Sequence, residues 1–231
     1  MEQVLTRKEQ VEKANRKFIS KVYGWMAIAL VISAFSALYT ANSYTLINMI
    51  WGSPFGFLIL VIAELVLVFW LSASLPKMSK TTAAIAFVAY SIINGVTLSS
   101  VFVVYTTATI SRVFLVTAIM FGVMTIYGMF TKQNLNSFGR YFMMGLFGVI
   151  IATFLNFLFR SNTLDIIISI VAVVIFVGLT AYDTQKIMKV SSYNDGSEMF
   201  QKVAIICALE LYLDFINIFF ILLRLFGRRD W

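Results

Sequence analysis

The sequence predicts an all-α, polytopic membrane protein with seven transmembrane helices, the last of which lies at the centre of the bundle. Of the 231 residues, 60% are hydrophobic and 13% are charged, which is more apolar surface than a soluble domain of this length can bury. The apolar residues form runs close to the roughly 20 residues that a helix needs to cross about 30 Å of hydrocarbon. The last run carries Glu210 and Asp214, and acidic residues inside a span usually face a bundle interior or a water-filled path.

Composition excludes several classes of function. The 18 basic residues outnumber the 11 acidic ones, but they lie between the apolar runs and not in one patch, so they indicate membrane topology and no nucleic-acid partner. Histidine is absent, which removes the commonest metal ligand and the side chain that ordinarily titrates between about pH 5 and 8. The chain has one cysteine, Cys207, so an intrachain disulfide is excluded. We expect no cofactor.

Residues 1–21 are polar and charged, and we expect them to form a cytosolic N-terminal segment ahead of the first span. The first apolar run is too long for the core of a signal peptide, so it predicts an uncleaved span. The predicted spans are residues 22–41, 55–75, 83–105, 113–131, 141–159, 165–182 and 203–226. Because the connections between them are short, we expect a single transmembrane domain over residues 22–227, followed by a short tail at 228–231.

The basic residues predict the orientation. Before the last span, all Lys and Arg residues except Arg112 and Arg160 fall in the N-terminal segment or in connections on its side of the membrane. Because Lys and Arg concentrate in cytoplasmic loops, we expect the N-terminus in the cytosol. Arg228 and Arg229 follow the last span, and a full crossing would place them outside. Either the earlier spans override the rule, or the last segment enters the membrane and returns.

Polar side chains mark one face of the last span. Glu210, Asp214 and Asn217 are separated by steps of three or four residues, so they lie on one face of a helix. The opposite face is apolar. Because a polar stripe within a span belongs in the middle of a bundle, Glu210 and Asn217 are candidates for lining a pathway beside Asp214.

Other spans carry isolated polar groups. Glu64 lies in the second span and Asn94 in the third, and both are candidates for lining the same pathway. Thr125 and Asn156 lie alone in the fourth and fifth spans. The alternative interpretation of uncharged groups of this kind is that they only hydrogen-bond to neighbouring helices.

Asp183 and Asp214 are the candidates for pH sensing and gating. Asp183 follows the sixth span, in Gly-Leu-Thr-Ala-Tyr-Asp at 178–183. If the two meet inside the membrane, repulsion between like charges and burial favour one shared proton near neutral pH. The pair would close when a proton bridges it and loosen when both groups ionise, and two ionised carboxylates suit transient contact with calcium. The alternatives are that Asp214 is a buried structural hydrogen-bond donor and that Asp183 is merely interfacial.

Two motifs near the C-terminus, taken together, resemble the Bax inhibitor-1, or transmembrane Bax inhibitor motif, family. They are Gly-Leu-Thr-Ala-Tyr-Asp-Thr-Gln at 178–185 and Leu-Tyr-Leu-Asp-Phe-Ile-Asn at 211–217. The seven-span plan, the polar N-terminal segment and Glu64 fit as well, so the resemblance covers nearly the whole chain. It implies a bacterial-type member with the last helix wrapped by the other six. It also implies pH-sensitive calcium leak, with Asp183 and Asp214 as the pH-sensing pair.

Some bacterial relatives in that family carry an arginine late in the second span that latches onto the first aspartate. Here residues 71–77 read Leu-Ser-Ala-Ser-Leu-Pro-Lys, without arginine. Lys77 is the one candidate substitute in this stretch, but an ammonium lacks the paired donors of a guanidinium. One bacterial branch of the family is also linked to modulation of a membrane-bound protease.

These features predict a pH-sensitive cation leak channel, with calcium as the main ion, in a bacterial inner membrane. Its partners would be the lipid bilayer, calcium or other cations, and protons, and a proton-coupled exchanger is a close variant. The alternative is a regulatory membrane protein without transport of its own. Such a protein would bind and modulate a membrane protease or another partner through residues 1–21 and the loop at 183–202. The sequence indicates no particular oligomeric state.

Enzymatic activity is not expected. Tyr182 followed by Asp183 matches one motif of intramembrane aspartyl proteases, which use two carboxylates to activate water. Those enzymes have a glycine-flanked pattern at the second aspartate, whereas here the residues before Asp214 are Leu211 to Leu213 with Tyr212 between them. Their proline-containing third motif is missing as well.

Overall fold

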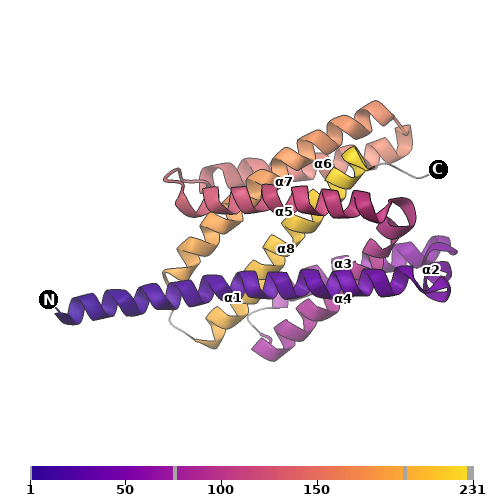
Figure 1. The fold of residues 1–231 in the computed structure, drawn as a ribbon. Coiled ribbons are helices and arrows are strands. Elements are labelled where there is room, and N and C mark those ends of the chain that lie inside the picture. The colour runs from indigo at the N-terminus through magenta and orange to yellow at the C-terminus, as the bar shows by residue number, and fades with distance from the viewer. Residues whose placement is uncertain (1, 75–76, 195–196, 228–231) are drawn as a thin grey trace. The chain divides into compact units, whose positions relative to one another are not determined.

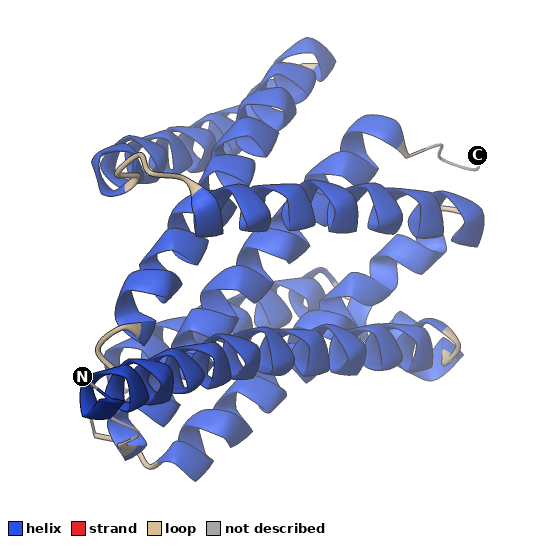
Figure 2. Cartoon of the chain, turned by 60° about the vertical axis from the view of Figure 1, so that its left-hand side comes forward, coloured by secondary structure: helices blue, strands red, loops and turns tan. Residues whose placement is uncertain are grey.

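The structure is a computed structural model that describes residues 2–74, 77–194 and 197–227. These residues form helices joined by short connections (Figure 1; Figure 2). The helices are α1 (Glu2–Ala41), α2 (Tyr44–Trp51), α3 (Pro54–Ser74), α4 (Lys80–Val104), α5 (Thr107–Phe130), α6 (Asn136–Phe159), α7 (Asn162–Ser191) and α8 (Glu198–Phe226). Seven of them, all except α2, are long and apolar enough to cross a membrane, which confirms the prediction of seven spans. The expected tail at 228–231 lies outside the described residues.

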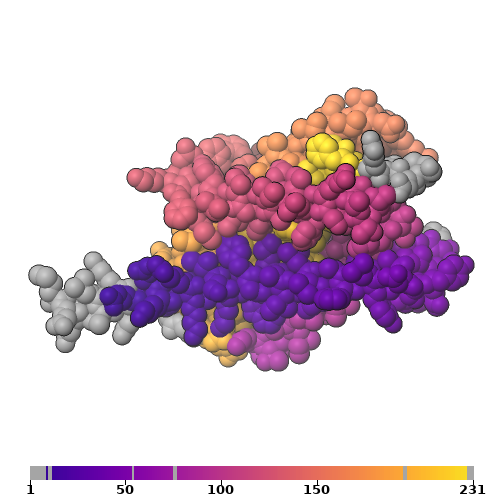
Figure 3. Space-filling model, in the orientation of Figure 1, coloured from indigo at the N-terminus to yellow at the C-terminus, as the bar shows by residue number. Residues whose placement is uncertain are grey.

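Helix α1 is about twice as long as a membrane crossing requires. It covers 40 residues, or about 60 Å at 1.5 Å per residue, against about 30 Å of hydrocarbon. The polar segment expected ahead of the first span is therefore the beginning of the same helix. Residues 2–23 contain neither glycine nor proline and are rich in Glu, Gln, Lys and Arg, which are good helix formers. In Figure 3 the described part of α1, in indigo, lies at the surface along its length.

Helix α2 is not predicted by the apolar pattern. It has 8 residues, too few to cross a membrane. The hydroxyl of Ser43 caps it by accepting a hydrogen bond from the backbone N–H of Leu46 at 3.4 Å. Trp51 at its end stacks on Phe57 of α3, with ring centroids 5.0 Å apart. Tryptophan favours the membrane–water interface, which suits a short helix between the first two spans.

Burial distinguishes the spans from one another. In the apolar stretch of α8, 67% of the residues are buried, compared with 50% in that of α4, 6% in that of α3 and 0% in that of α6. Helices α3 and α6 therefore expose their apolar side chains, as expected of helices that face lipid. The last helix is the most buried of the seven, which confirms the prediction made from its polar stripe.

Contacts divide the chain into two compact units, which we describe separately. The first unit comprises Met1–Thr106 and Val190–Tyr212, and the second comprises Thr107–Lys189 and Leu213–Trp231. Helix α8 therefore contributes its first half to one unit and its second half to the other. The single transmembrane domain expected over residues 22–227 stays a prediction.

In the first unit, small residues allow α1 and α4 to approach closely. The Oγ of Ser33 donates a hydrogen bond to the carbonyl of Ser91 at 2.7 Å, and the Oγ of Ser36 donates to the carbonyl of Ile92 at 2.9 Å. A Cβ added at Gly95 would lie 2.5 Å from the carbonyl oxygen of Ser33. Small residues and interhelical hydrogen bonds of this kind hold helices together where the hydrophobic effect does not.

We expect Gly95→Ala to destabilise the protein. The added methyl group would meet the backbone of α1, which cannot move aside as a flexible side chain can, so the free energy of unfolding should fall by about 1–3 kcal/mol. Thermal unfolding of the purified protein in detergent measures this. Gly24→Ala is the matched control, because a Cβ at Gly24 has nothing within 4 Å and alanine is favoured over glycine in a helix. Equal melting temperatures for the two variants would contradict the close approach.

In the second unit, the end of α8 is fixed to the start of α7. The Nε of Arg224 donates a hydrogen bond to Oδ2 of Asp165 at 2.6 Å, and Nη2 of Arg224 pairs with Oδ1 of the same carboxylate. Asp165 lies in the first turn of α7, about 27 Å along that helix from Asp183. An unbroken α8 therefore reaches the end of α7 opposite Asp183. This supports a full crossing by the last segment over the alternative in which it returns; Arg228 and Arg229 lie outside the described residues.

Candidate functional site

Asp183 and Asp214 are both buried, and both belong to the second unit. Asp183 on α7 is 9% exposed, and Asp214 on α8 is 4% exposed. Burial of a carboxyl group is unfavourable unless it is neutral or has partners, and each of these residues does have interaction partners. Asp183 is therefore enclosed by the protein, and whether it lies at the membrane interface stays open. A direct meeting of the two carboxyl groups stays a prediction.

Helix α5 is a common neighbour of the chain segments that carry the two aspartates. The ring of Phe121 packs edge-on against Phe215, the residue after Asp214, with centroids 5.6 Å apart. A Cβ added at Gly128 would lie 2.5 Å from the carbonyl oxygen of Ala181 and 2.9 Å from Cβ of Thr184, on either side of Asp183. Phe121 and Gly128 are about 10 Å apart along α5, or two turns. The segments around both aspartates therefore contact one short stretch of α5.

Thr125 lies in the middle of this stretch of α5. It follows Phe121 by four residues and precedes Gly128 by three, so the three residues share one helix face. The side chain is only 9% exposed, and its Oγ1 is buried with no hydrogen-bond partner among the described residues. A buried hydroxyl without a partner is uncommon in native proteins, which makes Thr125 a candidate for a functional group. The sequence shows Thr125 only as an isolated polar group; its position between the two contacts emerges from the packing.

A second polar cluster, in the first unit, includes two of the predicted pathway residues. The Nδ2 of Asn94 on α4 donates to Oε1 of Glu64 on α3 at 3.4 Å. The hydroxyl of Tyr212 on α8 donates to Oδ1 of Asn94 at 2.8 Å and lies 2.6 Å from Oγ of Ser33 on α1. Hydrogen bonds therefore connect four helices, from Glu64 to Ser33. Tyr212 was not among the predicted site residues, although it lies two positions before Asp214 in the second motif.

The count of protons in this cluster allows two arrangements. Ser33 donates its one hydroxyl proton to the carbonyl of Ser91, and Tyr212 donates its proton to Asn94, so the contact between the two hydroxyls then holds no proton. If the amide of Asn94 turns by half a rotation, it donates to Tyr212, Tyr212 donates to Ser33, and a protonated Glu64 donates to Asn94. Every contact then holds one proton. In this count the direction of the hydrogen bonds follows the protonation of Glu64; a pathway role for Glu64 stays a prediction.

We expect Tyr212→Phe to destabilise the protein by about 1–3 kcal/mol, because the buried groups of Asn94 and Ser33 would both lose a partner. The ring of Tyr212 is fully buried, and phenylalanine keeps its packing against Phe87 and Tyr90. Thermal unfolding in detergent measures the loss. Tyr127→Phe is the control, since that ring is exposed; a melting temperature for Tyr212→Phe equal to that of the control would show that the cluster contributes nothing.

The remaining predicted residues have separate surroundings. The Nδ2 of Asn217 donates to the carbonyl of Leu213 in its own helix at 2.8 Å, which is the alternative use of a polar group within a span. Glu210 is half-buried and has interaction partners, but it belongs to the first unit and Asp214 to the second. Lys77 is exposed in the connection after α3. A pathway role for Glu210 and Asn217, and a latch at Lys77, stay predictions.

The chemistry that these residues offer is that of oxygen atoms and exchangeable protons. Among the described residues, no three His, Cys, Asp or Glu side chains gather closely enough to hold a metal ion. Two buried aspartates can instead bind a proton, or contact a cation in passing when both are ionised. Proton binding and weak, transient cation contact are therefore the chemistry open to these residues, and gating stays a prediction.

Comparison with known proteins gives a consistent result. The family model described as inhibitor of apoptosis-promoting Bax1 matches residues 15–231. The chain is 43% identical over 214 residues to the inner membrane protein YbhL of Escherichia coli, a match that covers 92% of each chain. It is 42% identical over 226 residues to an uncharacterized protein of Borreliella burgdorferi, covering 97% of each chain. It is 43% identical over 213 residues to the uncharacterized protein YrjE of Lactococcus lactis, covering 91% of this chain and 90% of that one.

Proposed function

This chain belongs to the Bax inhibitor-1 family, and on that basis we propose that it is a pH-sensitive leak channel for cations, mainly calcium, gated by Asp183 and Asp214. Its seven long apolar helices make it a multi-pass membrane protein. The name of its Escherichia coli relative, inner membrane protein YbhL, supports placement in a bacterial inner membrane. The proposal keeps the N-terminus in the cytosol and includes no catalytic step.

One observation carries the proposal: two aspartates are buried in one unit, on segments that both contact the same two turns of α5. In such surroundings the two carboxyl groups disfavour simultaneous ionisation, so a single proton can be held between them. When that proton leaves, like charges repel and the helices that carry them are pushed apart. The two ionised carboxylates then attract a cation, which makes transient cation contact favourable in the open state.

The direct test is calcium flux into dye-loaded liposomes that contain the purified protein, measured from pH 6 to pH 8. We expect flux above that of empty liposomes, rising with pH as the pair ionises. Flux equal to that of empty liposomes at every pH would overturn the proposal. Cleavage of a transmembrane peptide by the protein, abolished by Asp214→Asn, would overturn its non-enzymatic character.

The length of α1 favours the regulatory alternative as a second candidate. The helix extends about 30 Å beyond a membrane crossing, and its polar half could dock a membrane protease or another partner. Deletion of residues 1–20 separates the two functions. A leak channel should retain its flux in liposomes after this deletion, whereas a regulatory protein should lose its effect on the partner.

A further inference from the structure

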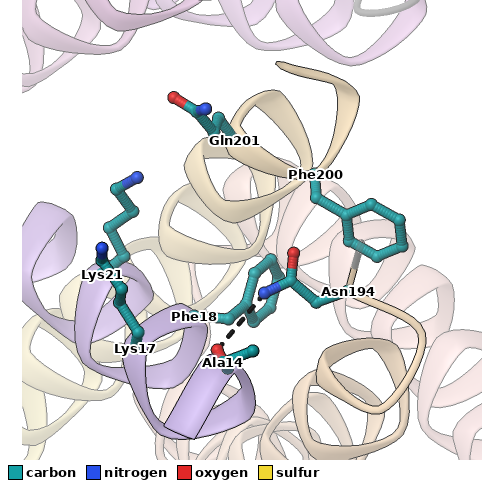
Figure 4. Close-up of a pocket in the computed structure, with 7 residues that line it drawn as sticks. All are labelled: Ala14, Lys17, Phe18, Lys21, Asn194, Phe200 and Gln201. Carbon is teal, nitrogen blue, oxygen red and sulfur yellow. Dashed lines mark hydrogen bonds between the residues drawn. The ribbon is translucent and has the colours of Figure 1, made fainter. Parts of the chain in front are cut away.

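A small basic pocket lies in the first unit, where α1 meets the connection into α8. It has a volume of about 200 Å³ and is lined by Ala14, Lys17, Phe18, Lys21, Asn194, Phe200 and Gln201. Figure 4 shows the two lysines of α1 on the left and Phe200 of α8 on the right, with Gln201 of α8 above. The proposed leak channel assigns no role to these residues.

Contacts between the residues of the pocket hold it in shape. Nδ2 of Asn194 donates a hydrogen bond to the carbonyl of Ala14 at 3.3 Å, which ties the connection to α1. Phe18 is buried and packs edge-on against Phe200, with ring centroids 6.3 Å apart and an interplanar angle of 76°. The result is an apolar floor beneath a basic rim.

The positive charge of the rim is not neutralised by the described part of the chain. Lys17 and Lys21 make no ion pair with described residues, and like charges four residues apart on a helix repel each other. Two acidic residues near the pocket have other partners. Glu12 pairs with Arg16, and Oε1 of Glu198 accepts a hydrogen bond from the backbone N–H of Lys80 at 3.0 Å. The pocket therefore favours an anion.

The position of the lysines along α1 indicates where that anion comes from. Lys21 directly precedes the apolar run of the first span, and Lys17 lies about 6 Å further out. The polar headgroup layer is about 5–7 Å deep on each side of the hydrocarbon. Both ammonium groups therefore lie at headgroup depth, with the aromatic floor beside them. Basic pockets between transmembrane helices at this depth suit acidic headgroups.

We propose that this pocket binds the headgroup of an anionic phospholipid. Lys17 and Lys21 hold the phosphate, Phe18 and Phe200 contact the first carbons of the lipid, and the amide of Gln201 hydrogen-bonds to headgroup hydroxyls, since it offers both a donor and an acceptor. The proposal does not rest on ion transport, because it concerns a separate site and a separate ligand.

Native mass spectrometry of the full-length protein in a neutral detergent, titrated with phosphatidylglycerol or phosphatidylcholine, tests this proposal. The wild type should bind phosphatidylglycerol and prefer it to phosphatidylcholine. The double variant Lys17→Gln/Lys21→Gln should bind phosphatidylglycerol roughly 30-fold more weakly. Lys13→Gln/Lys132→Gln removes two exposed lysines outside the pocket and should change binding less than threefold. Equal binding of the two lipids, or equal losses in the two double variants, would overturn the proposal.

Two further arms separate the pocket from general attraction. Gln201→Phe fills the pocket and keeps both lysines, so it should also weaken phosphatidylglycerol binding; unchanged binding would show that the lysines attract lipid without a pocket and would overturn the proposal. Lys17→Arg/Lys21→Arg should keep binding within threefold of the wild type. Inorganic phosphate at millimolar concentration should not displace the lipid; if it does, the site is one for free phosphate, which also overturns the proposal.

Discussion

In liposomes that contain the Asp214→Asn variant, we expect calcium flux to stay low from pH 6 to pH 8 and to lose its dependence on pH. Wild-type flux should rise over this range as the two aspartates ionise. Asparagine cannot ionise, and its amide can donate a hydrogen bond to Asp183 as the bridging proton does, so the closed state persists. A hydrogen bond to a charged group contributes about 1.5–3 kcal/mol. At pH 8 the flux should therefore be at least about tenfold below that of the wild type.

The companion variants show whether the two aspartates act as a unit. Asp183→Asn should give the same low flux, and the double asparagine variant should be no lower than either single one, because coupled residues are not additive. Glu9→Gln is the control, since Glu9 is an exposed acid near the start of α1, and its flux should follow the wild type. A wild-type pH profile in both single asparagine variants would show that the aspartates do not form the gate.

The spans could be predicted from the sequence because hydrocarbon imposes a length and a composition on each crossing helix. The same rule says little about segments outside the hydrocarbon. The apolar pattern marked residues 22–41 as the first span, but the helix begins at Glu2, since good helix formers continue it without a break. Helix α2 was missed because its 8 residues are too short for a period to stand out, and its N-cap at Ser43 is a local signal.

The site could be predicted only in part, because the sequence shows which side chains are polar but not which of them lie close together. Glu64 and Asn94 were named as candidates, and the structure brings them into contact. Tyr212, which links them to Ser33, lacks a charge and so carried no signal of its own. Asn217 illustrates the opposite case, since its amide is used within its own helix. A threonine in an apolar span is common, and only the packing of α5 distinguishes Thr125 from Thr117.

Replacing Thr125 with valine is expected to raise stability and to lower flux. Valine has the same shape as threonine without the hydroxyl, and Oγ1 of Thr125 is buried with no hydrogen-bond partner in the described part of the chain. Removal of such a group should increase the free energy of unfolding by about 1–3 kcal/mol. If the hydroxyl assists proton or cation passage between the segments that carry Asp183 and Asp214, flux at pH 8 should fall by roughly tenfold. Thermal unfolding and liposome flux on the same preparation measure both effects.

A gain in stability together with a loss of flux distinguishes a functional hydroxyl from a structural one. Thr117 lies on the same helix and is fully buried, but its Oγ1 donates to the carbonyl of Val113 at 2.8 Å, so Thr117→Val should lower stability by about 1 kcal/mol and leave flux unchanged. Thr125→Ser restores the hydroxyl and should restore the flux. If Thr125→Val loses both stability and flux, the hydroxyl has a structural partner, and the fall in flux follows from the loss of stability. A gain in stability without loss of flux would place the pathway away from this face of α5, because functional sites retain destabilising groups only where activity requires them.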